Sequence, residues 1–105
     1  MSFRITVRQG PKVFKERAES VEDAIEIAKR YVRGSRRRGP VDAIGRRYEA
    51  ADQVAVRIEI RGPTGHAGLD VHGDGGLVPW TGRVFRKPLD GDDPYAALAQ
   101  RLVEE

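Results

Sequence analysis

The chain has 105 residues, no cysteine and a formal net charge of +3 at pH 7. This length suits one domain and is too short for two, so we expect residues 1–105 to form a single small domain. The lack of cysteine excludes disulfides, thiolate nucleophiles and cysteine-ligated zinc, which is typical of a reducing compartment. There is no apolar run of about 18 residues, and arginines interrupt the N-terminal segment. We therefore expect a cytoplasmic protein with no membrane contact.

The first third of the chain predicts a hairpin followed by a helix. Apolar and polar residues alternate over 3–8, and turn residues at 9–12 lead to a second expected strand over 13–18. Ser20 and Asp23 form a capping pattern that begins a helix, with Gly34 available as its C-terminal cap. The apolar residues of this helix recur at helical spacing: Val21, Ala24, Ile25, Ala28 and Val32.

The central part of the chain predicts a short helix and then a strand. Val41, Ile44 and Tyr48 follow Pro40 at a spacing that allows a second helix, although Gly45 interrupts it. The next strand covers residues 53–61 and alternates strictly. Its expected core side chains are Val54, Val56, Ile58 and Ile60.

The last third predicts a long loop, a strand and a helix. Residues 62–82 contain seven glycines and two prolines, so we expect mostly irregular structure with a short strand at Leu69 and Val71. A further strand is expected over 82–87, and Asp93 with Pro94 is typical of a helix start. The apolar stripe of this last helix contains Tyr95, Leu98, Ala99 and Leu102.

The element order β-β-α-(α)-β-β-β-α predicts an α+β fold: a mainly antiparallel sheet of four or five strands with two or three helices on one face. Residues 1–33, with the helix segment SVEDAIEIAKRYV, are similar to the opening of HicB-like antitoxins and of several small bacterial domains. The resemblance covers about a third of the chain and contains no catalytic motif. It implies a recurring packing arrangement rather than a shared function.

Positive charge is concentrated in one stretch of the sequence. Residues 1–50 contain 13 basic and 7 acidic residues, and residues 29–47 alone have a net charge of +7. Such density is typical of a phosphate-contacting surface. The alternative is a GC-rich coding bias, which would raise the arginine content of the whole chain without any function. The chain has fifteen arginines but only four lysines. The candidate nucleic-acid contacts are Arg33, Arg36, Arg37, Arg38, Arg46 and Arg47.

Two weaker candidate sites lie in the second half of the chain. His66, Asp70, His72 and Asp74 offer imidazole and carboxylate ligands for a metal ion, or a general acid and base acting on RNA. The alternative is a soluble glycine-rich loop that has these residues on its surface. Trp80 could stack on a base or ligand, with Tyr48 as a second stacking candidate, or it could anchor the loop to the core.

No nucleophile elbow, P-loop or paired carboxylates at helical spacing are present, so we expect a non-enzymatic protein with no cofactor. The leading expectation is a protein-interaction or self-assembling domain that forms a homo-oligomer or binds a protein partner. The first alternative is a nucleic-acid module that uses residues 29–47. The second is a metal-dependent ligand binder or hydrolase that uses residues 66–74.

Overall fold

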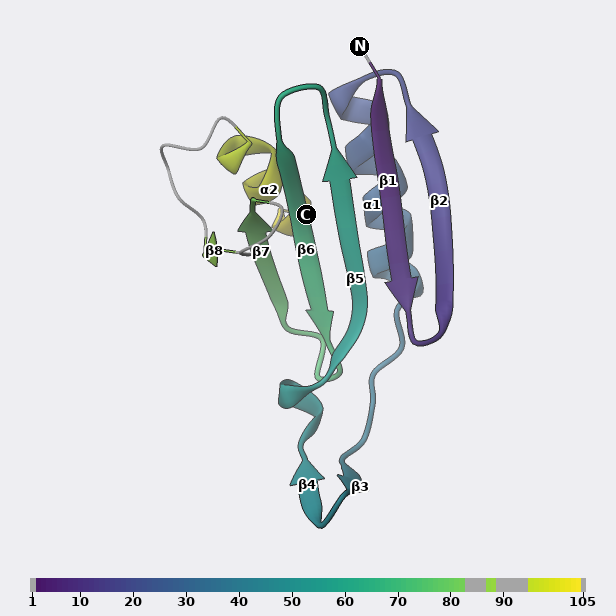
Figure 1. The fold of residues 1–105 in the computed structure, drawn as a ribbon, viewed down its shortest axis with the longest axis vertical. Coiled ribbons are helices and arrows are strands. Elements are labelled where there is room, and N and C mark those ends of the chain that lie inside the picture. The colour runs from purple at the N-terminus through teal and green to yellow at the C-terminus, as the bar shows by residue number, and fades with distance from the viewer. Residues whose placement is uncertain (1, 83–86, 89–94, 105) are drawn as a thin grey trace.

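Figure 1 shows the computed structural model of the chain, which describes residues 2–82, 87–88 and 95–104. Its main feature is an antiparallel sheet in the order β2-β1-β5-β6-β7-β8, with two helices that cover the same face (Figure 1). The predicted α+β class is confirmed. The elements of this body are β1 (Phe3–Gln9), β2 (Lys12–Ala18), α1 (Val21–Gly34), β5 (Val54–Arg61), β6 (His66–His72), β7 (Leu77–Thr81), β8 (Lys87–Pro88) and α2 (Ala96–Val103).

The predicted N-terminal hairpin is confirmed, and it sets the two faces of the sheet. β1 pairs with β2 on one side and with β5 on the other, both antiparallel. Ile5 and Val7 of β1 and Ile58 and Ile60 of β5 are buried under the helices. Because side chains alternate along a strand, the residues between them face away from the helices. The sheet therefore has one apolar face and one open face.

Helix α1 begins where its capping residues predict, because the backbone N–H of Asp23 donates to Ser20 Oγ at 3.1 Å. Its end differs from the prediction. Gly34 is the last helical residue rather than a left-handed cap, and the N–H of Ser35 donates to the carbonyl of Val32 at 3.1 Å. The chain leaves the helix in an extended conformation, so the conformational freedom of Gly34 is not needed there.

The predicted second helix near Pro40 is wrong. The chain forms a small hairpin of β3 (Val41–Ala43) and β4 (Arg46–Tyr48), followed by the 3-10 turn η1 (Ala50–Asp52). Ile44 and Gly45 join the two strands with positive φ angles of 53° and 66°. Two left-handed residues in succession define a hairpin turn that no helix tolerates. Residues 35–53, which we call the arm, project from one end of the sheet (Figure 1).

The short strand predicted at Leu69 and Val71 is confirmed as part of β6. The irregular structure predicted for the rest of residues 62–82 is wrong, because β6 and β7 form a regular hairpin within it. Gly68 lies inside β6, where the ring of Trp80 takes the space that a side chain would need. A bulge between Val54 and Val56 also turns Ala55 inward and leaves Val54 exposed, contrary to strict alternation in β5.

The apolar stripe predicted for the last helix is confirmed: Tyr95, Leu98, Ala99 and Leu102 are all buried. Most of the strand expected over 82–87, together with the expected helix start at Asp93 and Pro94, lies outside the described residues. Neither described helix has the length and apolar character needed to cross a membrane.

The two helices are joined by an ion pair in which Arg101 donates two hydrogen bonds of 2.7 Å to the carboxylate of Glu22. These bonds hold the pKa of Glu22 below its ordinary value of 4.5. A lowered folded-state pKa stabilises the fold above the unfolded pKa, and this stabilisation is lost as pH falls through the folded value. The difference in unfolding free energy between the parent and Glu22→Gln should therefore be small at pH 7, because the pair is exposed, and should disappear in acid.

Urea unfolding between pH 7 and pH 3 measures this difference, with Glu19→Gln as the control because Glu19 is an exposed carboxylate just before the helix. The control should follow the parent at every pH. A Glu22→Gln difference that stays constant across the acid range would contradict the role of the ion pair.

Candidate functional site

The open face of the sheet is strongly cationic. Alternation along β1, β2 and β5 places six basic side chains there, against two carboxylates from the same face of β5 and β6. No helix of the described chain lies over this face (Figure 1). The basic residues, which we call the sheet-face cations, are Arg4, Arg8, Lys15, Arg17, Arg57 and Arg61. The two carboxylates are Glu59 and Asp70.

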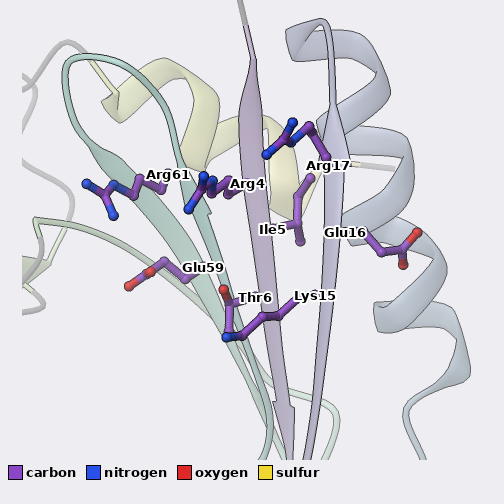
Figure 2. A pocket seen from close by; sticks show the side chains of 8 residues that line it. All are labelled: Arg4, Ile5, Thr6, Lys15, Glu16, Arg17, Glu59 and Arg61. Carbon is purple, nitrogen blue, oxygen red and sulfur yellow. The ribbon is translucent and has the colours of Figure 1, made fainter.

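Three arginines form a row across neighbouring strands. Arg4 of β1 lies directly opposite Arg17 of β2 and directly opposite Arg61 of β5. Figure 2 shows these three side chains on the same side of the sheet. Like charges directly opposite each other on adjacent strands, about 4.8 Å apart, destabilise a sheet. The row therefore opposes folding unless an anion neutralises it.

Most of the sheet-face cations lack a partner. Among the described residues, neither the arginines of the row nor Arg8 or Lys15 forms an ion pair with a carboxylate. Glu16, whose neighbours in β2 are Lys15 and Arg17, turns to the helix face and accepts a hydrogen bond of 2.6 Å from Tyr31 (Figure 2). Its negative charge is thus directed away from the open face.

Shallow hollows follow this face. One of about 450 Å³ lies between β2, β1 and β5, and its lining includes the row of arginines with Thr6, Lys15 and Glu59 (Figure 2). A second of about 450 Å³ continues toward β7 and reaches Arg8, Arg57 and Trp80. Extended hollows lined by cations can hold successive anionic groups.

Arg57 is the exception among the sheet-face cations because it is neutralised within the fold. Its guanidinium donates to both carboxylate oxygens of Asp70, at 2.9 and 3.0 Å. These bonds raise the pKa of Arg57 above its ordinary value. Trp80 Nε1 also donates to Asp70 at 3.0 Å. The three side chains form a network that leaves five sheet-face cations for a ligand.

Trp80 lies on strand β7 rather than in a loop, with 3% of its surface exposed. Its indole packs over Gly68 on the same side of the sheet as the cations. Tyr48, the second stacking candidate, lies on β4 with the Arg46 guanidinium 5.3 Å from its ring centroid. The structure thus places the two aromatic candidates on different elements.

The basic stretch predicted from the sequence is divided between α1 and the arm. Arg33 lies in the last turn of α1 and pairs with Glu26 at 3.1 Å, and Arg47 of β4 pairs with Glu49 at 2.7 Å. Arg37 donates to the carbonyl of Asp74. Arg36 and Arg38 lie in the extended segment at the start of the arm, and Arg46 begins β4. The stretch is cationic but does not lie on one element.

The base of the arm is fastened to the β6–β7 turn. The N–H of Arg38 donates to the carbonyl of Gly73 at 2.7 Å, and the N–H of Gly73 donates to the carbonyl of Gln53 at 2.8 Å. The Gln53 side chain donates to the carbonyls of Gly39 and Tyr48, at 3.0 and 3.3 Å. These bonds hold both ends of the arm against the sheet.

The four metal-ligand candidates are not brought together. Asp70 is engaged by Arg57 and Trp80, and His72 Nδ1 lies 2.8 Å from the carbonyl oxygen of Ala51. Asp74 accepts a hydrogen bond of 2.8 Å from the N–H of Gly76, and His66 Nδ1 lies 3.9 Å from Glu59. Over residues 2–82, 87–88 and 95–104, no group of three or more metal-ligating side chains gathers.

The sheet-face cations were not predicted as a site from the sequence. The alternation of Arg4 and Arg8 in β1, and of Arg57 and Arg61 in β5, does show that these side chains face solvent. The missing information is that β1 and β5 are neighbours although about 50 residues separate them. Comparison with protein-family models, curated proteins and solved structures finds no match to this chain.

Proposed function

We propose that this protein is a non-enzymatic nucleic-acid-binding module that holds the sugar-phosphate backbone on the open face of its sheet. The observation that supports this most strongly is the row Arg17, Arg4 and Arg61, which has no carboxylate partner in the described structure. A row of phosphates would neutralise these charges and release counterions from the nucleic acid.

The chemistry of the face favours backbone contacts over base recognition. Its basic groups are spread over neighbouring strands, and its one tryptophan is buried against Gly68 and bonded to Asp70. Phosphate contacts position a protein on nucleic acid without reading the sequence. We therefore infer weak dependence on base sequence and strong dependence on salt.

Self-association through this face is disfavoured, because two copies would bring their unpaired arginines together. Edge-to-edge pairing through β2 is disfavoured for a similar reason. Lys12, Lys15 and Arg17 occupy that edge strand, and charged side chains on an edge oppose strand addition. A polyanion fits the charge of the face better than a second copy does.

A salt titration of binding to a mixed-sequence DNA duplex tests the proposal. With five unpaired sheet-face cations, the slope of log K against log salt should be about −4 to −5, and Kd near physiological salt should lie at about 10⁻⁴ to 10⁻⁶ M. Polyglutamate of equal charge is the control ligand and should bind more weakly. Tighter binding to polyglutamate would contradict the proposal, as would the absence of DNA binding stronger than about 10⁻⁴ M at low salt.

A further inference from the structure

The tip of the arm combines backbone strain with complete exposure of an apolar side chain. Ile44 has a φ angle of 53°, and 99% of its surface is exposed. A β-branched residue in the left-handed region is a strained outlier. Asn, Asp and Gly are the residues that favour this turn position. Because Ile44 packs against nothing in the described structure, no burial of its side chain offsets this strain.

The arm that ends in this apolar tip has an excess of positive charge. Between residues 36 and 49 the arm has five arginines against Asp42 and Glu49. Val41, at the end of β3 opposite the turn, is a second exposed aliphatic residue of the arm, with 48% of its surface exposed. The arm stands apart from the body of the protein, beyond the end of the sheet (Figure 1). A basic two-stranded ribbon with an apolar tip is thus held out from a cationic body.

This ribbon is long enough to reach into a groove of duplex DNA. Strands of three residues extend about 10 Å, which exceeds the depth of about 7.5 Å of the minor groove. The ribbon is wider than a closed minor groove of about 6 Å, so entry requires the groove to open. Apolar wedges that unstack a base step open the groove and kink the duplex. A-form RNA presents a different pair of grooves, one deep and narrow and the other shallow.

From these observations we infer that the arm enters the minor groove of duplex DNA, with Ile44 as a wedge between neighbouring base pairs and Arg46 and Arg47 near the flanking phosphates. This rests on the proposed function, in which the sheet-face cations hold the backbone. The hydrogen bonds at the base of the arm, from Arg38 and Gln53, fix the direction in which the ribbon projects before DNA binds. A ribbon held in this way loses little conformational entropy on insertion.

The variant Ile44→Asn separates insertion from folding, because asparagine suits the turn and should keep or raise the melting temperature of the free protein. The probe is a DNA duplex of about 30 base pairs with 2-aminopurine inside and a fluorophore pair at its ends. The parent should raise the 2-aminopurine fluorescence and shorten the end-to-end distance. The variant should do neither. Its slope of log K against log salt for DNA binding should equal that of the parent, because the arginines remain. Val21→Asn, which removes an exposed aliphatic side chain from α1, is the matched control and should behave as the parent.

Several outcomes overturn the inference. It fails if Ile44→Asn unstacks the duplex as the parent does, or if the parent binds with a steep salt slope but leaves the bases stacked; the proposed function stands in both cases. It also fails if the substitution converts an oligomer of the free protein into a monomer by light scattering, since Ile44 would then be covered by a second copy. If the parent does not bind DNA at low salt, the proposed function and this inference fall together.

Discussion

The triple variant Arg4→Gln, Arg17→Gln, Arg61→Gln is expected to bind duplex DNA about 10²-fold more weakly than the parent. The slope of log K against log salt should also become shallower, by about 3. The three guanidinium groups form one row across β2, β1 and β5, so a bound backbone would contact all of them. Each lost phosphate contact removes about 0.9 from the slope. Fluorescence anisotropy at several salt concentrations measures both quantities.

The matched control removes three positive charges from the other side of the sheet. Lys29→Gln, Arg30→Gln, Arg33→Gln changes the net charge equally, but these residues lie on α1, which packs on the helix face. The control should lose far less affinity than the row variant. Equal losses would show that binding follows the net charge of the protein, and the open face would then not be the site. Relief of the like-charge row should leave the row variant at least as stable as the parent.

The second large effect is expected on stability. Gly68→Ala should lower the free energy of unfolding by about 2–3 kcal/mol, or about 10–20 °C in melting temperature. A Cβ at this position would lie 2.1 Å from Cζ2 of Trp80 and 2.5 Å from the carbonyl oxygen of Ile58. The indole ring and the β5 backbone would both have to move. The hydrogen bond from Trp80 to Asp70 would be strained as a result.

The same substitution at Gly34 is the control for Gly68→Ala. Gly34 ends α1 without a positive φ, and a Cβ there would meet no atom within 4 Å apart from its chain neighbours and the backbone of its own helix. Gly34→Ala should leave stability unchanged or raise it by up to about 1 kcal/mol, because alanine favours helix. Thermal unfolding followed by circular dichroism measures both variants. Equal melting temperatures for Gly68→Ala and the parent would refute the packing of Trp80 on Gly68.

Local patterns predicted the elements whose stability comes from alternation or capping. The N-terminal hairpin, the start of α1 at Ser20 and the apolar stripe of α2 all follow from neighbouring residues. The β6–β7 hairpin was missed because its glycines resemble loop residues. In the structure Gly68 is required by the packing of Trp80, which lies twelve residues away in sequence. Such a pairing cannot be deduced from composition alone.

The arm depends on a backbone conformation, and the candidate site on a strand pairing, that local sequence patterns do not show. Spacing allowed a helix at residues 41–48, whereas the chain turns at Ile44, a residue that seldom adopts a positive φ. The basic stretch and the end of its helix near Gly34 were visible in the sequence, but the hairpin that contains Arg46 and Arg47 was not. The row of arginines on the open face arises only when β1 meets β5. Long-range strand pairing, rather than residue type, forms this surface.

The alternation of β1 has a consequence for how this protein can vary. Ile5 and Val7 maintain the hydrophobic interior, while Arg4, Thr6 and Arg8 contribute only to the outer surface. Replacement of the outer residues leaves the interior packing intact, so the charge of the surface can be redesigned without rebuilding the scaffold. Surface charge and foldability thereby depend on interleaved positions of the same strand, and each can change while the other is preserved.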